Sequence, residues 1–509
     1  MNKILVLDFG GQYNQLIARR IRDMHVYAEI ESYRSMTVEM IRERAYKGIV
    51  FTGGPNSVYE DGAPGFDPAV LDLDIPVLGI CYGAQLIAYM SGGKVQKSEQ
   101  SSEYGKTTLY TEPDALFKGM PETSICWMSH TDYISELPDD YLRTAYTVQC
   151  PYAGIRHKEK KIYAIQFHPE VTHTEYGKQI FRNFLFDICG CAPDWTMDDF
   201  IDRSVEQYRN ELRDKNVLLA LSGGVDSAVT AVLLHRAVGD HLTCVFVDHG
   251  LLRKGEAEEV ENTFRNTFGM NLIRVDARDR FLTRLAGVTD PELKRKIIGE
   301  EFIRTFEAEA HLLGKMHVLA QGTIYPDIVE SGKGDSAVIK SHHNVGGLPS
   351  VIAFERIVEP LRYLFKDEVR EVGIKLGLPT DLVYRQPFPG PGLAVRIIGE
   401  ITREKLELLQ EADAILREEI KNSMRKAPDQ YFAALTNTRS VGVMGDARTY
   451  GYTIALRAVE TDDFMTAEWT RIPWECLAVI SNRITNEVHG VSRVVYDITS
   501  KPPGTVEWE

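Results

Sequence analysis

Residues 217–229 read VLLALSGGVDSAV, and this stretch decides how the middle of the chain folds. The apolar run at its start predicts a buried strand of a parallel sheet. A glycine turn follows before an amphipathic helix begins, and it consists of Ser222, Gly223, Gly224, Val225, Asp226 and Ser227. Glycines let backbone N–H groups approach an anion, and a helix N-terminus favours negative charge. The stretch therefore predicts a phosphate-binding loop.

The predicted loop is not a Walker loop, because it lacks the G-x-x-x-x-G-K-[ST] spacing and the turn contains no lysine. Its SGGxDS pattern resembles the phosphate loop of the ATP pyrophosphatases, enzymes that split ATP between its α- and β-phosphates. The resemblance implies an ATP site in which Mg²⁺ accompanies the phosphates and Asp226 is the candidate metal ligand. The structural alternative is an ordinary glycine turn capped by Ser227, but such a turn needs neither two serines nor an aspartate.

Length and composition limit the classes of protein to consider. A chain of 509 residues is too long for one hydrophobic core and predicts about three domains. The net charge of −15 argues against nucleic acid or a membrane surface as the main partner, and no apolar run reaches 18 residues. Seven cysteines lie without paired spacing, and no signal peptide precedes the first predicted strand at Lys3. We therefore expect reduced thiols and a cytoplasmic protein.

Strands alternate with helices through most of the chain, and glycines follow several of the strands. This alternation predicts an α/β fold with two doubly wound parallel-sheet domains followed by a small α/β C-terminal domain. The predicted domains are 1–195, 196–385 and 386–509. The expected strands of the two sheets are 3–8, 48–52, 75–80, 161–167, 217–221, 242–248, 272–276 and 317–321.

Two predicted linkers separate the three domains, one rich in charged residues and the other rich in prolines. A helix at 197–212 is expected to connect the first two domains, and a proline-rich linker at 386–393 precedes the third. Further expected elements are a helix at 402–424, strands at 431–444 and 450–459, a helix beginning at Trp474 and a strand at 492–498.

Cys81 lies at the centre of a second motif, GICYG at 79–83. Glycines on both sides let a strand turn sharply into a helix, so the motif predicts a nucleophile elbow with cysteine in the nucleophile position. The helix N-terminus, together with a nearby histidine, favours the thiolate form. Cys81 is therefore the predicted reactive cysteine.

A base and an oxyanion site are expected near this cysteine. His168 and Glu170 are two positions apart in an extended segment, so their side chains fall on one side and Glu170 can orient the imidazole. Backbone N–H groups at Gly54 and Tyr82 are the predicted oxyanion donors. This set resembles the class I glutamine amidotransferases, which implies that glutamine is hydrolysed through a glutamyl thioester and releases ammonia. The rival bases are His130 and His173.

Candidate anion ligands also follow the phosphate loop. Asp248 ends a predicted strand, where it reads equally well as a nucleotide ligand or as a helix cap. Arg253 lies just after the same strand end and suits an anionic acceptor. The glycine-rich stretch at 339–347 has the composition of a mobile lid over the phosphates and contains Lys340. Lys366 reads equally well as a further phosphate ligand or as a lysine on a helix surface.

The motifs GICYG with HPE, SGGVDS, IKSHHN, RQPFPGPGL and KPPGTVEWE occur in this order along the chain. Together they resemble the family of glutamine-hydrolysing GMP synthases over essentially the whole length. The resemblance implies that the substrates are ATP, glutamine and XMP, and that ammonia displaces AMP from an adenylated XMP after pyrophosphate has left. It also implies a homodimer formed through the C-terminal domain and an XMP site made by Arg253, Arg385, Lys501, Val506 and Glu507. The alternative is another glutamine-dependent synthetase of the pyrophosphatase group, such as NAD synthetase.

Overall fold

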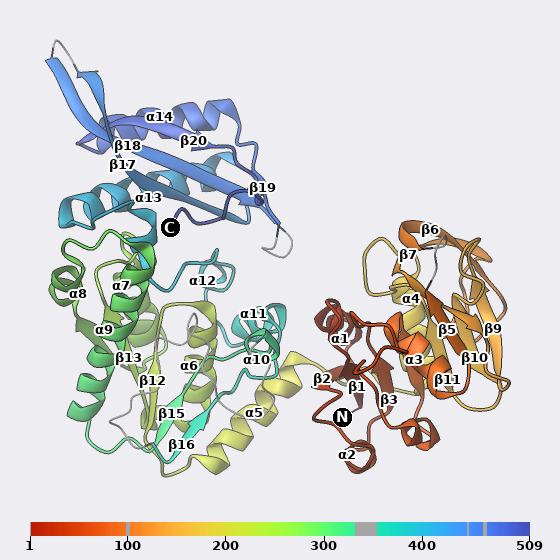
Figure 1. Ribbon diagram of the computed structural model, residues 1–509. Coiled ribbons are helices and arrows are strands. Elements are labelled where there is room, and N and C mark those ends of the chain that lie inside the picture. The colour runs from red at the N-terminus through yellow and green to blue at the C-terminus, as the bar shows by residue number, and fades with distance from the viewer. Residues whose placement is uncertain (1, 98–101, 331–353, 445–446, 462–465) are drawn as a thin grey trace. The chain divides into compact units, whose positions relative to one another are not determined.

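The computed structural model describes residues 2–97, 102–330, 354–444, 447–461 and 466–509 (Figure 1). These residues form two compact units, one consisting chiefly of the chain up to Phe200 and the other chiefly of the chain from Ile201 onward. Each unit has its own sheet layers.

The first unit contains a nine-stranded sheet in the order β2-β1-β3-β4-β11-β10-β9-β6-β7. Its parallel part consists of β2 (Tyr27–Ser32), β1 (Lys3–Asp8), β3 (Gly48–Phe51), β4 (Val77–Ile80) and β11 (Ile162–Ile165). Its antiparallel part consists of β10 (Gly154–His157), β9 (Tyr141–Tyr146), β6 (Glu103–Thr111) and β7 (Thr123–His130). Four strands of the parallel part, β1, β3, β4 and β11, were predicted, whereas β2 and the antiparallel extension were not.

Helices cover both faces of the parallel part. The helices of this unit are α1 (Asn14–Arg22), α2 (Val38–Glu43), α3 (Tyr82–Met90) and α4 (Gly177–Arg182), and a small separate sheet pairs β5 (Lys94–Lys97) with β8 (Asp132–Glu136). Leu5 and Leu7 of β1 belong to the same apolar cluster as Ile87 of α3. Ile4 faces the other side: its Cδ1 and Cε1 of Phe184, in the π-helix Asn183–Ile188 that follows α4, lie 3.0 and 3.5 Å from where a Cβ on Gly48 would be. Alternate residues of a strand therefore pack against different helices, as a doubly wound sheet requires.

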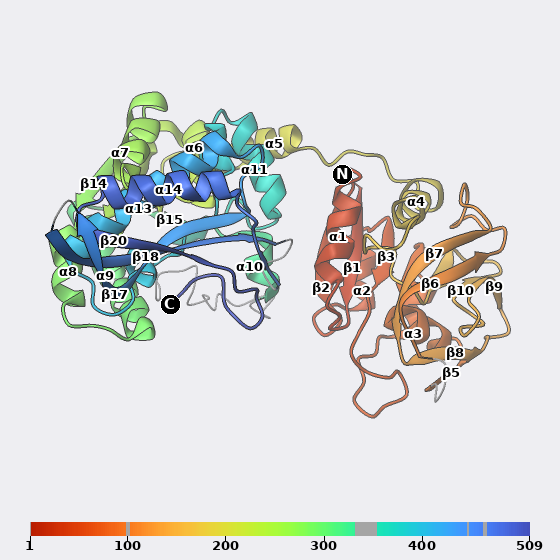
Figure 2. The same cartoon turned by 90° about the horizontal axis from the view of Figure 1, so that it is seen from above.

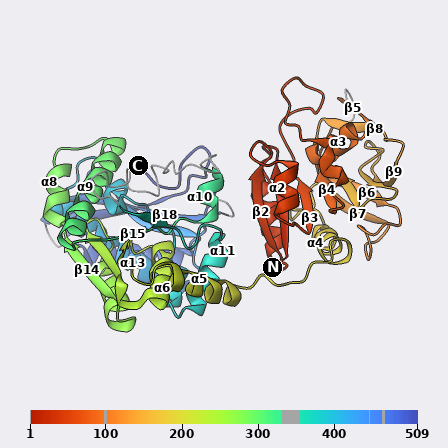
Figure 3. The same ribbon diagram turned by 90° about the horizontal axis from the view of Figure 1, so that it is seen from below.

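The second unit contains a five-stranded parallel sheet in the order β14-β13-β12-β15-β16. The strands are β14 (Asn271–Asp276), β13 (Leu242–Asp248), β12 (Val217–Ala220), β15 (Val318–Ala320) and β16 (Arg356–Val358). The helices are α5 (Met197–Glu211), α6 (Val225–Val238), α7 (Glu256–Glu261), α8 (Arg278–Leu285), α9 (Pro291–Leu312), α10 (Tyr325–Glu330), α11 (Lys366–Lys375) and α12 (Thr380–Val383). In Figure 1, β12 and β13 lie between α9 and α6. Figure 3 shows α8 beside α9 and α6 beside α11.

The C-terminal part of this unit adds a mixed sheet. Its strands are β17 (Gln430–Met444), β18 (Ala447–Glu460), β19 (Glu468–Trp469) and β20 (Val491–Asp497), with β20 parallel to β18 and the other pairs antiparallel. The helices α13 (Arg403–Ser423) and α14 (Trp474–Glu487) pack together against the sheet (Figure 2). One apolar cluster includes Leu218 of β12, Leu409 of α13 and Ile454 of β18. The two sheets of the unit therefore share a continuous core.

The predicted fold class, two doubly wound sheets followed by a small α/β region, is confirmed. The helices predicted at 197–212 and 402–424 are present within one residue of their expected ends. Among the helices of the described residues, none has the length and apolar character needed to cross a membrane.

Candidate active site

The backbone at Cys81 makes a sharp strand-to-helix turn. β4 ends just before Cys81, α3 begins just after it, and Cys81 itself has a φ of 53°. A Cβ on Gly79 would lie 2.7 Å from the carbonyl oxygen of Gly83, and a Cβ on Gly83 would overlap the carbonyl oxygen of Phe51. Only glycine fits at these two flanking positions, so the predicted nucleophile elbow is confirmed as a backbone geometry.

His168 and Glu170 lie in the segment after β11, within the same site. Nδ1 of His168 is 2.6 Å from Oε1 of Glu170, both side chains are buried, and the imidazole also hydrogen-bonds Cys81. Burial alone would lower the pKa of His168, but the charge of Glu170 and the hydrogen bonds from Cys81 and Glu170 raise it well above its usual value. The structure therefore brings the three predicted residues together and favours an imidazolium beside the sulfur.

Gly53 and Gly54 border this site. A Cβ on Gly53 would lie 3.7 Å from Cε1 of His168 and 3.9 Å from Cβ of Cys81. A Cβ on Gly54 would lie 3.0 Å from Cγ of Tyr82, the first residue of α3. Backbone N–H groups beside a helix N-terminus can stabilise an oxyanion. The oxyanion role of Gly54 and Tyr82 stays a prediction that this placement supports.

The two rival histidines have other partners. Nε2 of His130 lies 3.4 Å from Oε2 of Glu103 in a buried cluster that also contains Cys150. Thr147 donates hydrogen bonds to both oxygens of Glu103, at 2.9 and 3.0 Å, so the protein itself satisfies this carboxylate and we assign no metal to the cluster. The ring of His173 packs against Trp127 with a centroid separation of 4.6 Å.

The predicted phosphate loop connects β12 to α6. Gly223 has a φ of 79°, in the region that favours glycine, and Gly224 occupies the N-cap of α6. The hydroxyls of Ser222 and Ser227 hydrogen-bond each other at 2.9 Å. A Cβ on Gly322, after β15, would lie 3.0 Å from the backbone nitrogen of Ser227. The loop thus keeps its shape through local hydrogen bonds and through a glycine in the segment that follows the neighbouring strand β15.

Asp226 and Lys366 contact each other directly. Nζ of Lys366, the first residue of α11, lies 2.8 and 2.7 Å from the two carboxylate oxygens of Asp226 in the first turn of α6. The candidate metal ligand and the candidate phosphate ligand therefore occupy one site and form an ion pair with each other. Lys340, the other predicted phosphate ligand, lies outside the described residues.

Glu256 connects two of the arginines predicted to bind XMP. Its Oε1 pairs with Nη2 of Arg385 at 2.5 Å, and its Oε2 accepts a hydrogen bond from the backbone N–H of Arg253 at 3.0 Å. Arg385 also donates to the carbonyl oxygen of Gly223 in the phosphate loop, at 3.4 Å. The guanidinium of Arg253 lies 4.3 Å from the ring centroid of Phe388. These contacts place both arginines beside the phosphate loop.

The side chain of Arg253 is buried without full hydrogen bonding. Its Nε and Nη2 atoms have no hydrogen-bond partner among the described residues. Burial and the nearby charges of Arg385 and Arg396 lower the pKa of Arg253 to about 10. A buried cation with unused donors is costly unless an anion binds to it. These unused donors support the prediction that Arg253 binds an anion.

The C-terminal tail reaches the same region through Arg396. This fully buried arginine lies 5.2 Å from the ring centroid of Phe388 and donates two hydrogen bonds to Glu507, at 3.0 and 2.8 Å. Val506 is buried in an apolar cluster of the C-terminal sheet. Lys501 forms an isolated backbone bridge with the residue before β19, and its side-chain role stays a prediction.

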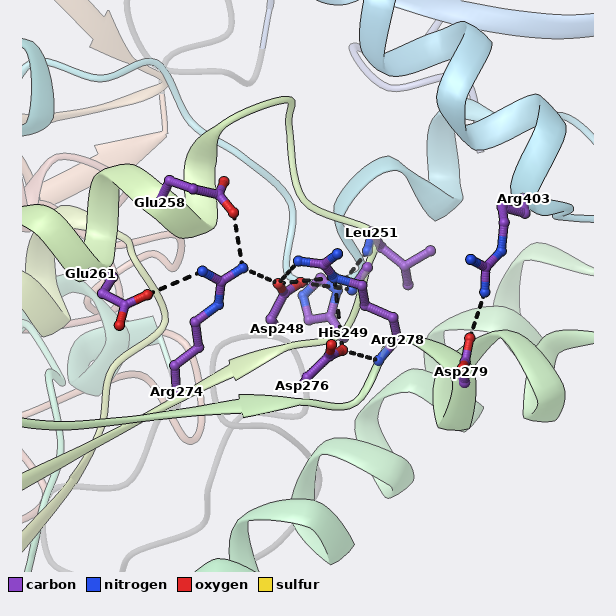
Figure 4. Close-up of polar contacts among 11 residues, drawn as sticks. Asp248, His249, Leu251, Glu258, Glu261, Arg274, Asp276, Arg278, Asp279 and Arg403 are labelled. Carbon is purple, nitrogen blue, oxygen red and sulfur yellow. Dashed lines mark hydrogen bonds and ion pairs between the residues drawn. The ribbon is translucent and has the colours of Figure 1, made fainter.

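Asp248 is held inside the protein by two arginines (Figure 4). Its Oδ2 accepts hydrogen bonds from Arg274 at 2.8 Å and from Arg278 at 3.0 and 2.6 Å. Burial opposes the charge, but these hydrogen bonds lower the pKa of Asp248. The next residue, His249, is fully buried, accepts a hydrogen bond from the backbone N–H of Leu251 and has a pKa lowered by burial to about 4. The next helix, α7, has Gly255 rather than Asp248 at its N-cap, so these contacts point to a third role, in which Asp248 fixes the loop after β13. Its role as a nucleotide ligand stays a prediction.

Three residues of these sites were missed by the sequence analysis. Glu256 could have been predicted, because it begins a helix three positions after the candidate Arg253 and a glutamate in that place can pair with an arginine. Arg396 carried no such signal, since its partner Glu507 is 111 positions away. Gln166, whose Nε2 lies 3.7 Å from the sulfur of Cys81, precedes the histidine by two positions.

Fold and sites together define a class of protein, a glutamine amidotransferase joined to a nucleotide-dependent synthetase. Family models agree with this class. The model of class-I glutamine amidotransferases matches residues 5–188, the NAD synthase model matches 197–294, and the model of the GMP synthase C-terminal domain matches 418–508.

Full-length relatives identify the family. A glutamine-hydrolysing GMP synthase of Acetivibrio thermocellus is 60% identical over 508 residues, which cover 99% of both chains, and one of Carboxydothermus hydrogenoformans is 58% identical over the full length of both. The chain belongs to the family of glutamine-hydrolysing GMP synthases, as predicted. The NAD synthetase alternative is not favoured, because the NAD synthase model matches only one segment. A solved structure of a putative GMP synthase subunit from Thermoplasma acidophilum is 37% identical, with a TM-score of 0.34, and covers 37% of this chain and 94% of its own.

Proposed function

We propose that this chain converts XMP to GMP with ATP and with ammonia taken from glutamine, through an adenylated XMP. The observation that supports this most strongly is the buried, incompletely bonded guanidinium of Arg253 next to the arginine that contacts the phosphate loop. An anionic purine nucleotide beside an ATP phosphate site would supply the missing hydrogen-bond acceptors.

In the glutaminase half, Cys81 attacks the side-chain carbonyl carbon of glutamine as a thiolate. The proton held by His168 passes to the leaving ammonia, and Glu170 keeps the imidazole oriented through its 2.6 Å contact. Donors at Gly54 and Tyr82 stabilise the negative oxygen of the tetrahedral intermediate. Water then hydrolyses the glutamyl thioester, which releases glutamate and restores the thiol.

In the synthetase half, the C2 oxygen of XMP attacks the α-phosphorus of ATP and pyrophosphate leaves. The backbone N–H groups of the 222–227 loop and the side chain of Lys366 would hold the phosphates, while Arg253 and Arg385 would hold XMP. Ammonia then attacks C2, and AMP departs with the oxygen that XMP supplied. The roles of Lys501, Val506 and Glu507 at the XMP site are part of the same proposal.

A magnesium ion carried by ATP fits this loop chemically. Proteins hold Mg²⁺ through one or two carboxylates together with substrate phosphates, and Asp226 offers its carboxylate in the first turn of α6. The bound ion would offset the negative charge of the phosphates. Because Lys366 contacts both oxygens of Asp226, binding would require the lysine to exchange this partner for a phosphate.

We further propose that the protein is a cytoplasmic homodimer formed through the C-terminal sheet. Val441 and Tyr450 lie opposite each other in the β17–β18 ribbon, and Val443 falls on the same face as Val441. These side chains are 57%, 64% and 74% exposed, respectively. An apolar face of this kind suits a second copy of the chain. A Val443→Lys substitution is expected to shift the sedimentation coefficient from dimer to monomer, and an unchanged coefficient would contradict this surface.

The function is tested by supplying ATP and glutamine with one acceptor at a time. With XMP we expect GMP, AMP and pyrophosphate in equal amounts, and with deamido-NAD or aspartate no product above background. Failure of XMP to support turnover would falsify the named substrate. Omitting Mg²⁺ and adding a chelator is expected to stop pyrophosphate release while leaving glutamine hydrolysis measurable.

A further inference from the structure

Two buried glutamine side chains form a chain of hydrogen bonds that ends at the sulfur of Cys81. Gln85 lies on α3 and is 4% exposed, and Gln166 follows β11 and is fully buried. Nε2 of Gln85 lies 2.8 Å from the carbonyl oxygen of Asp132 and 3.2 Å from Oε1 of Gln166. Nε2 of Gln166 lies 3.7 Å from Sγ of Cys81.

The backbone carbonyl of Asp132, at the end of this chain of hydrogen bonds away from Cys81, determines the orientation of both amides. A carbonyl oxygen only accepts hydrogen bonds, so the atom of Gln85 that faces Asp132 must be its amide nitrogen. The same nitrogen faces Gln166, which must therefore present its oxygen to Gln85. The other end of the Gln166 amide is then its NH₂ group, and this donor points at the sulfur of Cys81.

A donor in this position favours one protonation state of the sulfur. A thiolate accepts a hydrogen bond much more strongly than a neutral thiol does, and the difference grows in a buried site. The carbonyl oxygen of Ser129, 3.8 Å from the same sulfur, acts in the opposite sense because it can accept only from the thiol. The Gln166 amide thus offsets both this carbonyl and the burial of Cys81.

We infer that Gln166 is a further catalytic residue, whose amide N–H stabilises the Cys81 thiolate, and that Gln85 is a positioning residue that fixes this amide. The inference rests on the proposed role of Cys81 as nucleophile. His168 accepts the thiol proton, and Gln166 supplies a neutral hydrogen bond that does not titrate.

The test measures the sulfur directly. Full-length protein is treated with iodoacetamide between pH 5 and 10 without glutamine, and mass spectrometry follows alkylation of the Cys81 peptide. In the Gln166→Leu variant we expect alkylation about fivefold slower near neutral pH, with the midpoint of the rate profile at higher pH. The kcat of glutamine hydrolysis is expected to fall by a similar factor, and the KM for glutamine to stay within about twofold.

Two further variants separate this role from a structural one. Gln166→Glu keeps the shape but places a carboxylate near the sulfur, so its alkylation should be slower than in the leucine variant. Gln85→Leu should have a smaller effect in the same direction, and combining it with Gln166→Leu should add little, because the two residues act through one hydrogen bond. Gln96→Leu, at an exposed position on β5, is the control that should leave the profile unchanged.

An alkylation profile of Gln166→Leu or Gln166→Glu that superimposes on the wild-type profile would overturn the inference. Ammonia-dependent GMP synthesis reports whether the second unit of each variant is folded, and circular dichroism reports on the whole chain. If Cys81 were not the nucleophile, the Cys81→Ala variant would keep its glutaminase activity. That result would contradict the proposed function without depending on Gln166.

Discussion

The two candidate sites differ in how completely the chain alone assembles them. Around Cys81, the imidazole already contacts the carboxylate, and the buried amides contact each other and the sulfur. Around the phosphate loop, Arg253 has unused donors and Lys366 is paired with the candidate metal ligand. The difference teaches that contacts within the chain already assemble the first site, whereas the second site holds charged groups whose hydrogen bonds are incomplete in the chain alone.

The largest expected effect comes from a substitution that should inactivate one site and leave the other intact. Cys81→Ala removes the nucleophile, so glutamine-dependent GMP synthesis should fall by at least about 10³-fold. Synthesis with added ammonium salt should stay within about twofold of wild type, because the second site is untouched. Both rates are measured as GMP formed. Loss of the ammonia-dependent reaction would contradict the assignment of glutamine hydrolysis and GMP synthesis to two separate sites.

Arg253→Met tests whether the second site is built for an anion. Loss of charged hydrogen bonds should lower kcat/KM for XMP by about 10²-fold. Without ligand, the melting temperature should not fall and should rise slightly, because a buried cation with unpaired donors has been removed. Stabilisation by added XMP should disappear. A variant that melts much lower without XMP would show that Arg253 is structural.

Glu256→Gln addresses the contact that holds the two arginines. The amide can still accept the hydrogen bond from the backbone of Arg253 but no longer carries a charge for Arg385. We expect kcat/KM for XMP to fall by about tenfold, since the arginine keeps a neutral partner. Alkylation of Cys81 serves as the control and should not change. An unaltered kcat/KM for XMP would show that Glu256 does not contribute to the XMP site.

The smallest expected effect concerns acid stability of the loop after β13. The pKa of His249 is about 4 in the folded protein, below its usual 6.5, so the unfolded chain binds a proton first as the pH falls. Stability should therefore decrease from pH 6.5 towards 4, by about 1 kcal/mol at pH 5.5. The melting temperature of His249→Asn should depend less on pH over this range than that of wild type. Equal dependence in both proteins would contradict this assignment.

Sequence reasoning succeeded where the chemistry is local. The elbow at Cys81 follows from two glycines within five residues, and the phosphate loop follows from a strand, a turn and a helix that are contiguous in the chain. His168 and Glu170 were close enough in sequence for their contact to be expected.

Contacts between distant residues were not predictable in the same way. Arg396 and Glu507 meet only because the tail folds back on the C-terminal sheet, and Asp248 meets two arginines from the next strand and helix. Some antiparallel strands of the first sheet escaped prediction because they lack a regular alternation of buried and exposed residues, as in β9 and β10. Pairing of this kind depends on tertiary packing rather than on local propensity.

The backbone conformation of Cys81 also affects the stability of the fold. A residue other than glycine at a φ of 53° costs on the order of 1–2 kcal/mol of folding free energy. A glycine at this position would relieve that strain, so the fold would gain stability by giving up its nucleophile. A cysteine at position 81 therefore lowers the stability of the first unit. In return, the same backbone conformation projects its sulfur into the site.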